Sequence, residues 1–188
     1  MTTSPRNVVV LGSTGSIGRS TLEVIEHSQG KLRLLGLSAN TSLPLLLEQA
    51  QRFRPRFLGV TNPKLANEFD WSSLPAGSEL LQGPDALEQL ASHPDADVVV
   101  AAVVGSAGLS GAWAALEAGK TLALANKETL VMAGPLVTRL AEERGAKILP
   151  VDSEHSAVYQ ALACGRRDEV RRVVLTASGG PFRRHTRE

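Results

Sequence analysis

Near the start of the chain stands the stretch Val8-Val9-Val10-Leu11-Gly12-Ser13-Thr14-Gly15-Ser16-Ile17-Gly18. Its apolar part predicts a buried strand, and a helix-compatible run follows the glycines. Glycines at such a junction allow a tight turn, a close approach of backbone to ligand, and close packing of helix on strand. The spacing is GxxGxxG, whereas the common dinucleotide fingerprint is GxGxxG. Its place between a first strand and a first helix predicts a dinucleotide site, with a plain tight turn as the alternative.

The rest of the chain alternates between strand-like and helix-like patterns. Apolar runs predict strands at Val8–Leu11, Leu32–Leu37, Phe57–Val60, Val98–Val103, Thr121–Ala125, Lys147–Val151 and Val170–Thr176. Helical patterns lie at Ile17–His27, Leu43–Phe53, Asp85–Ser92, Leu109–Ala118, Gly134–Arg144 and Ser153–Ala163. Strands that are apolar on both faces, alternating with helices, are typical of βαβ units. We therefore predict an α/β protein with a Rossmann-like, doubly wound, mostly parallel sheet, followed by the start of an α/β catalytic domain.

Two regions depart from this alternation. Five prolines punctuate residues 54–96, and Phe69–Gly83 matches neither the helix nor the strand period, so we expect a variable excursion there. At the other end, Ser178-Gly179-Gly180-Pro181-Phe182 follows a predicted strand and the sequence stops after a short polar run. We expect the sequence to be an interrupted protein.

Composition excludes several classes of function. Lys and Arg number 20 against 19 Asp and Glu, a formal charge of +1, so no field attracts nucleic acid or an anionic membrane. The longest apolar run, Val98–Val104, is far short of the roughly 18 residues of a membrane span. The N-terminus does not resemble a secretory signal. Because the single cysteine, Cys164, permits no internal disulfide, we expect a cytoplasmic protein.

The segment after the second predicted strand bears on the choice of cofactor. NAD sites commonly place an acidic residue about 20 residues after the glycine turn, to bind the ribose hydroxyls. Here the segment is Ser38-Ala39-Asn40-Thr41-Ser42, which has no carboxylate to repel a 2′-phosphate. NADP is therefore the better fit, although no Arg or Lys meets the phosphate charge there. Capping of the helix that begins near Leu43 explains part of this segment equally well.

Polar residues also follow two later strands. Ala125 is followed by Asn126, Lys127 and Glu128, which we expect at the sheet edge where ligands of open α/β sheets bind. A solvated first helical turn is the competing interpretation of Lys127 and Glu128.

The strand Lys147–Val151 is followed by Asp152-Ser153-Glu154-His155-Ser156. Two carboxylates separated by one residue can converge on Mg²⁺ or Mn²⁺, both of which favour oxygen ligands. Two ligands do not complete a site, and an N-cap with Glu154 near the helix start is the more common arrangement. We interpret His155 as a surface or packing residue.

Taken in order, four motifs resemble one enzyme family, the 1-deoxy-D-xylulose 5-phosphate reductoisomerases. They are Gly12-Ser-Thr-Gly-Ser-Ile-Gly18, Ala125-Asn-Lys-Glu128, Leu149-Pro-Val-Asp-Ser-Glu-His155 and Ser178-Gly-Gly-Pro-Phe182. The resemblance covers essentially the whole chain but only about the N-terminal half of the family's length. It implies a metal-dependent rearrangement of the deoxyxylulose phosphate skeleton. Hydride transfer from NADPH then gives 2-C-methyl-D-erythritol 4-phosphate, a step of non-mevalonate isoprenoid biosynthesis.

The resemblance also implies roles for individual residues. Asp152 and Glu154 match two of the family's metal ligands. Positions that contact the sugar phosphate substrate are matched by Lys127, Ser153, Glu154 and Ser178. Positions of the pyrophosphate loop are matched by Thr14, Gly15, Ser16 and Ile17, those of the adenosine-phosphate segment by Asn40, Thr41 and Ser42, and those near the nicotinamide by Asn126 and Glu128.

The chain departs from the family pattern in two ways. Thr41 stands where many members carry a lysine, and the sequence stops before the third carboxylate ligand, the active-site lid and most phosphate-binding residues. We therefore expect residues 1–150 to form an NADPH-binding domain and 151–188 the beginning of a catalytic domain. As a fragment the chain is expected to be inactive, whereas the full-length enzyme is expected to be a homodimer. The main alternative is a nucleotide-sensing module without catalysis. An ordinary dehydrogenase is a third interpretation, but it would need a catalytic cysteine or lysine context that this sequence does not show.

Overall fold

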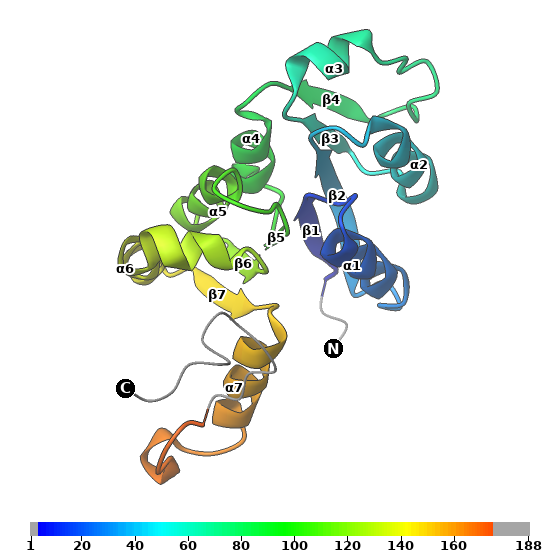
Figure 1. Ribbon diagram of the computed structural model, residues 1–188. Coiled ribbons are helices and arrows are strands. Elements are labelled where there is room, and N and C mark those ends of the chain that lie inside the picture. The colour runs from blue at the N-terminus through cyan, green and yellow to red at the C-terminus, as the bar shows by residue number, and fades with distance from the viewer. Residues whose placement is uncertain (1–3, 175–188) are drawn as a thin grey trace, which may run out of the picture. The chain divides into compact units, whose positions relative to one another are not determined.

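The computed structural model describes residues 4–174, in which strands and helices alternate (Figure 1). The strands are β1 (Arg6–Leu11), β2 (Leu32–Ala39), β3 (Phe57–Val60), β4 (Glu79–Gln82), β5 (Val98–Ala101), β6 (Thr121–Leu124) and β7 (Lys147–Pro150). The helices are α1 (Ser16–Glu26), α2 (Leu43–Phe53), α3 (Pro63–Glu68), α4 (Ala86–Ser92), α5 (Gly108–Glu117), α6 (Lys127–Arg144) and α7 (Ser153–Ala163). A 3₁₀ turn spans Arg167–Glu169. The chain divides into two compact units, Met1–Leu149 and Pro150–Glu188.

The strands form one parallel sheet in the order β4-β3-β2-β1-β5-β6-β7. From β1 the chain winds outward through β2, β3 and β4, and it then crosses back to β5 on the other side of β1. The strand order therefore reverses between β1 and β5, which is the topological switch point of a doubly wound sheet. The predicted α/β class and doubly wound topology are confirmed.

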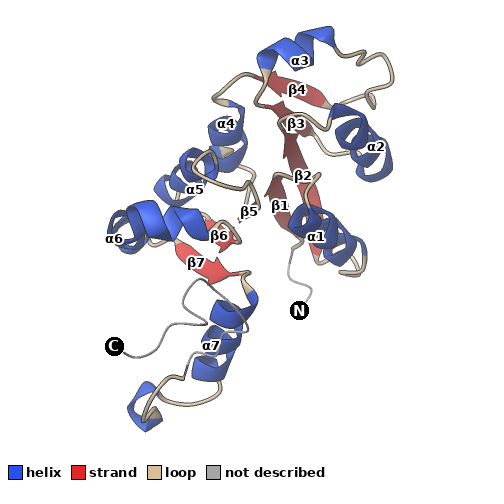
Figure 2. Cartoon of the chain, viewed as in Figure 1, coloured by secondary structure: helices blue, strands red, loops and turns tan. Residues whose placement is uncertain are grey.

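Helices cover both faces of the sheet (Figure 2). Val8 and Val10 of β1 pack into one core with residues of α1 and α2. Val9 and Leu11 pack into a second core with residues of α4, α5 and α6. Successive side chains of a strand point to opposite faces, so a strand that is apolar throughout supplies both cores.

Helix α6 is longer than the sequence pattern predicted, since it begins at Lys127 rather than at Gly134. Its backbone departs from helical geometry at Ala133, where φ is −136° and ψ is 20°. Pro135 explains the kink, because its ring excludes the carbonyl four residues earlier and it has no amide to donate. Two helical segments thus meet at the kink, and the second one corresponds to the predicted helix Gly134–Arg144.

The region predicted as an irregular excursion contains two short elements, α3 and β4. Asn62 caps α3 by accepting a hydrogen bond from the Leu65 amide at 3.2 Å, and Pro63 occupies its first turn. Strand β4 is an edge strand, paired with β3 alone. A strand of four residues with one partner leaves a weak sequence pattern, which is why it was missed.

The predicted strand Val170–Thr176 is wrong over the residues that the structure describes. Val170–Val174 has no strand structure, and the last two residues of the predicted strand, like Ser178, lie outside the described part of the chain. Val170, Val173 and Val174 are 41%, 57% and 66% exposed. An apolar run becomes a strand only where it finds a hydrogen-bonding neighbour, and no described strand pairs with this one.

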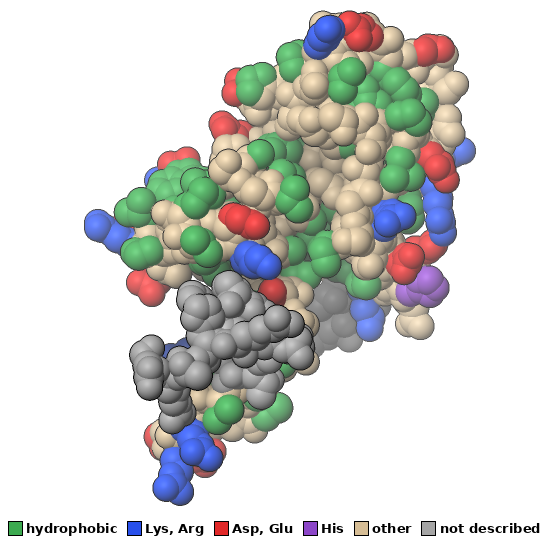
Figure 3. Space-filling model, in the orientation of Figure 1, with side chains coloured by type: hydrophobic (Ala, Val, Ile, Leu, Met, Phe, Trp, Pro, Cys, Tyr) green, Lys and Arg blue, Asp and Glu red, His purple; other side chains and the backbone are tan. Residues whose placement is uncertain are grey.

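Apolar side chains also gather on the surface over α6 (Figure 3). The exposed large ones of this helix are Leu130, Val131, Met132 and Leu136. Within residues 4–174, no helix is both long enough and apolar enough to cross a membrane.

Candidate functional site

The turn between β1 and α1 contains two glycines, Gly12 and Gly18, that no larger residue could replace. Gly12 has φ +81°, and a Cβ there would lie 2.9 Å from the Ala102 carbonyl oxygen. A Cβ on Gly18 would overlap the Gly12 carbonyl oxygen and the Ser13 backbone. Gly18 therefore lets α1 pack directly onto the turn, the role its position predicted, and Gly12 provides the left-handed backbone conformation.

Gly15 differs from these two glycines. Its φ is −74°, and a Cβ there would meet only the Gly12 carbonyl oxygen, at 3.5 Å, an ordinary van der Waals distance. The fold does not require a glycine at this position. A glycine that the fold itself does not require is typical of a place where a ligand approaches the backbone closely.

The N-terminus of α1 offers unpaired amides. Gly15 is the N-cap and supplies no side-chain hydrogen bond, and the first turn contains no acidic residue. The amides of Ser16, Ile17 and Gly18 have no acceptor among the described residues. Unpaired amides together with the positive end of the helix dipole make a binding site for an anion such as a phosphate group.

A cavity of about 720 Å³ opens beside this turn. Its walls come from the end of β2 and from the segments that follow β1, β2, β3, β4 and β5. The lining residues are Gly12, Thr14, Gly15, Ser38, Ala39, Asn40, Thr41, Thr61, Pro84, Leu87, Ala102, Val103, Val104, Ala107 and Ser110, with no charged side chain among them. The cavity thus lies at the carboxyl ends of the strands around the switch point, where open α/β sheets bind ligands.

The structure brings together four of the predicted cofactor residues, Thr14, Gly15, Asn40 and Thr41, in the lining of this cavity. Asn40 donates from Nδ2 to the Thr61 hydroxyl at 2.7 Å, which links the ends of β2 and β3. Ser42 is the N-cap residue of α2, but its side chain makes no capping hydrogen bond. Helix capping therefore explains the position of Ser42 and leaves its hydroxyl unexplained.

Asn126 lies outside that lining and is 3% exposed. Its Nδ2 donates to the carbonyl oxygens of Val103 and of Gly105, the latter at 2.9 Å. Its Oδ1 accepts from the amide and the hydroxyl of Thr129, at 2.8 and 2.7 Å. All the hydrogen bonds that an amide side chain can make are used within the chain, so Asn126 fixes the β5–α5 loop and caps α6.

Lys127 and Glu128 occupy the first turn of α6, directly after β6. Lys127 is exposed, Glu128 is partly buried, and neither lines the cavity. An acidic residue at this point also stabilises the helix dipole.

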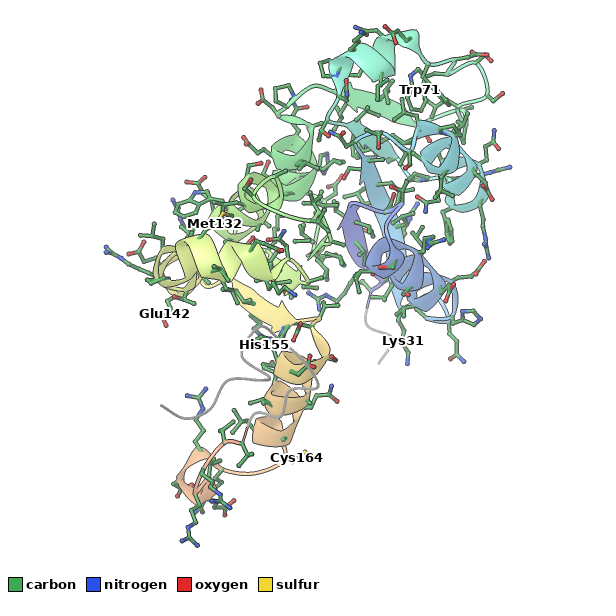
Figure 4. All side chains as sticks on the ribbon, viewed as in Figure 1. Lys31, Trp71, Met132, Glu142, His155 and Cys164 are labelled. Atoms are coloured by element: carbon green, nitrogen blue, oxygen red, sulfur yellow. The ribbon has the colours of Figure 1, made fainter. Side chains whose placement is uncertain are left out.

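In the second compact unit, Asp152 is the N-cap of α7 and Glu154 lies in its first turn. Asp152 Oδ1 accepts from the His155 amide at 3.3 Å and lies 2.7 Å from His155 Nδ1, and Figure 4 labels His155 near the start of the helix. Ser153 donates from its hydroxyl to Glu154 Oε2 at 2.7 Å. Residues 4–174 contain no group of three or more His, Cys, Asp or Glu placed to hold a metal. The hydrogen bond from the His155 amide to Asp152 is the capping arrangement predicted as the alternative, and that arrangement is present.

Sequence reasoning missed part of the cavity wall. Thr61, Pro84 and Leu87 were not predicted, and Ala102 and Val103 were assigned to a strand that ends at Ala101. The change to small residues at the end of β5 could have located this part of the wall. Residues just beyond the carboxyl end of a strand lie at the edge of the sheet where ligands bind.

Comparison with known proteins adds independent findings. The family model described as "1-deoxy-D-xylulose 5-phosphate reductoisomerase" matches residues 8–134, and that of the family's C-terminal domain matches residues 148–188. A curated 1-deoxy-D-xylulose 5-phosphate reductoisomerase from Symbiobacterium thermophilum is 49% identical over 182 residues, which cover 95% of this chain and 47% of the relative. One from Oleidesulfovibrio alaskensis is 50% identical over 181 residues, covering 95% and 44%.

Solved structures agree. The reductoisomerase from Zymomonas mobilis in complex with NADPH has a TM-score of 0.87 and 43% identity, covering 97% of this chain and 48% of that one. A reductoisomerase in complex with magnesium has a TM-score of 0.77 and 42% identity, covering 83% and 39%. This chain spans about half the length of the relatives it matches. From its glycine turn, its cavity at the switch point and these matches, the chain belongs to the 1-deoxy-D-xylulose 5-phosphate reductoisomerase family.

Proposed function

We propose that this chain carries the cofactor-binding part of an enzyme that converts 1-deoxy-D-xylulose 5-phosphate to 2-C-methyl-D-erythritol 4-phosphate with NADPH, in non-mevalonate isoprenoid biosynthesis. The observation that carries the proposal is the cavity at the switch point, which opens beside unpaired helix amides. The NADPH complex of the Zymomonas mobilis relative, which covers 97% of this chain, supports it. The same relatives disfavour a nucleotide sensor without catalysis.

The cofactor's diphosphate is proposed to accept hydrogen bonds from the amides of Ser16 and Ile17, with the hydroxyls of Thr14 and Ser16 as further donors. Its adenosine end is proposed to lie along Asn40, Thr41 and Ser42. Since this segment has no carboxylate, it does not repel a 2′-phosphate, which supports NADPH over NADH. When bound, the cofactor supplies the hydride that reduces the substrate carbonyl.

At the nicotinamide end we assign different parts to Asn126 and Glu128. The four hydrogen bonds of Asn126 support a positioning role, in which it holds the loop that carries Val103 and Val104. Glu128 is proposed to contact the cofactor.

Asp152 and Glu154 are proposed as two ligands of Mg²⁺ or Mn²⁺. Their carboxylates suit hard cations, and a capping hydrogen bond is compatible with ligation because a carboxylate has about four acceptor sites on two oxygens. When bound, the cation supplies a Lewis acid that stabilises negative charge on substrate oxygens. The resemblance to the family implies a third carboxylate, and residues 4–174 hold no third ligand grouped with these two.

Lys127, Ser153, Glu154 and Ser178 are proposed to contact the sugar phosphate substrate. Lys127 supplies positive charge, or a proton, near the reacting oxygens, and its exposed ammonium is available for this. Ser153 orients the Glu154 carboxylate through the hydrogen bond between them. For the full-length enzyme we further propose a homodimer and a cytoplasmic location, the latter supported by the free thiol of Cys164.

The test has two parts. Titration of the 188-residue chain with NADPH and with NADH, followed by nucleotide fluorescence, is expected to give tighter binding of NADPH. In the full-length enzyme, Glu154→Gln is expected to lower kcat by about 100-fold or more, because one charged metal ligand becomes neutral. Glu68→Gln, an exposed acid of α3, is the matched control and leaves kcat unchanged. Failure of the chain to bind NADPH would overturn the proposed cofactor site.

A further inference from the structure

Three buried polar side chains meet behind the β1–α1 turn. Ser13 belongs to the turn, Ser38 to the end of β2 and Gln49 to α2, and they are 0%, 1% and 6% exposed. The other buried residues of α2 are Leu43, Leu46 and Ala50, so Gln49 is the one polar group on the buried face of that helix. A buried amide is costly unless it is hydrogen-bonded, and a leucine at this place would have added to the core instead.

The side-chain amide of Gln49 makes two hydrogen bonds to Ser13, one as acceptor and one as donor. Its Oε1 accepts from the Ser13 hydroxyl at 2.7 Å, and its Nε2 donates to the Ser13 carbonyl oxygen at 3.0 Å. On the other side, the Ser13 amide donates to the Ser38 carbonyl oxygen at 2.9 Å, and the Gly12 amide donates to the Ser38 hydroxyl at 3.0 Å. Ser13 is thus held from α2 and from β2 at once.

The residues that follow Ser13 are those that face the ligand. Thr14 and Gly15 line the cavity, and the unpaired amides of α1 begin at Ser16. The Gly15 amide makes one long contact with the Gly12 carbonyl oxygen, at 3.3 Å, and the Arg19 amide donates to the Gly15 carbonyl oxygen at 3.0 Å. Close packing of α1 at Gly18 supports the turn from one side, and the hydrogen bonds from Gln49 to Ser13 support it from behind.

We propose that Gln49 is a positioning residue for the dinucleotide. It holds Ser13 so that the amides at the start of α1 point at the diphosphate before the ligand arrives. The inference rests on the proposed NADPH site and extends it to a residue with no access to the ligand. A turn fixed in advance loses less conformational freedom on binding, which raises affinity.

The test compares Gln49→Leu with Leu46→Ala in the 188-residue chain. Leu46 is fully buried on the same helix and has no hydrogen bond to the turn, so its truncation destabilises the fold without releasing Ser13. Circular dichroism gives the Tm of each variant, and nucleotide fluorescence, measured well below that Tm, gives the Kd for NADPH. Gln49→Leu is expected to raise the Kd by about tenfold, the equivalent of one hydrogen bond to a buried group. Leu46→Ala is expected to lower the Tm while leaving the Kd within about twofold.

Ser13→Ala is a second variant, which removes the hydroxyl and keeps the main-chain bonds. It is expected to raise the Kd by about threefold, and it decides the matter if Gln49→Leu does not fold. A Kd unchanged from that of the parent chain in the folded variants overturns the positioning role. Equal weakening by Leu46→Ala overturns it as well, since general loosening would then explain the effect. If the parent chain itself does not bind NADPH, the proposed function is wrong, and this outcome is distinct from failure of the positioning role.

Discussion

Packing within the turn requires a glycine at position 18, whereas at position 15 we propose that the approach of the ligand requires one. Gly18→Ala places a methyl group against the Gly12 carbonyl oxygen and the Ser13 backbone, which cannot both move. We expect this variant to lose about 3 kcal/mol or more of unfolding free energy, as overpacked cores do. Gly15→Ala meets only ordinary contacts, so its Tm is expected to stay within a few degrees of the parent value while its Kd for NADPH rises.

Thermal unfolding and NADPH titration of both variants check this contrast. An equal loss of stability in the two, or undiminished affinity in Gly15→Ala, would show that the ligand does not approach Gly15.

Asp152 combines a capping role with a proposed metal role, and one pair of variants separates them. Asp152→Ala removes the hydrogen bond to the His155 amide and is expected to cost about 1 kcal/mol of stability, whereas Asp152→Asn keeps a good N-cap. Both remove the charge that a cation requires. In the full-length enzyme we therefore expect both variants to lose Mn²⁺ affinity and turnover, with a lower Tm in the alanine variant alone. Normal turnover in the asparagine variant would leave Asp152 with its capping role only.

At the scale of elements, Asn126 joins α6 to the loop after β5. Asn126→Asp keeps the oxygen that accepts from Thr129 but turns a donor into an acceptor facing the carbonyl oxygens of Val103 and Gly105. A buried carboxylate against two carbonyls is expected to cost about 2–4 kcal/mol of unfolding free energy, measurable by urea unfolding. Because Val103 lines the cavity, weaker NADPH binding is expected with it. If the variant and the parent chain have the same urea midpoint of unfolding, the loop does not depend on this side chain.

The elements also show what the sequence could predict. β1 and α1 were predicted closely because a run of buried valines and a glycine turn are local signals. α3 and β4 were missed because their stability comes from a cap and a single neighbouring strand. The role of Asn126 was hidden for another reason, since two of its partners lie 21 and 23 residues away. Thr14, Gly15, Asn40 and Thr41, predicted because strand ends form the ligand edge, do line the cavity, whereas the opposite wall depends on where β5 ends.

At the scale of the whole molecule, we expect this chain to bind the cofactor without catalysing the reaction. The cavity and the amides that would hold a dinucleotide lie within the unit Met1–Leu149. The proposed metal ligands Asp152 and Glu154 are two carboxylates, with no third ligand grouped with them in residues 4–174. A divalent cation held by two carboxylates keeps most of its water and binds weakly, so it stabilises little charge on a substrate.

We therefore expect the 188-residue chain to bind NADPH and yet show no turnover with 1-deoxy-D-xylulose 5-phosphate and Mn²⁺. Oxidation of NADPH is followed by absorbance, with the full-length Zymomonas mobilis enzyme as positive control under the same conditions. Turnover near the rate of that control would mean that the residues present here complete the active site, and the assignment of two incomplete ligands would have to be abandoned. Binding without turnover instead locates cofactor recognition in the sheet and its glycine turn, and shows that the two carboxylates at the start of α7 do not by themselves support the chemistry.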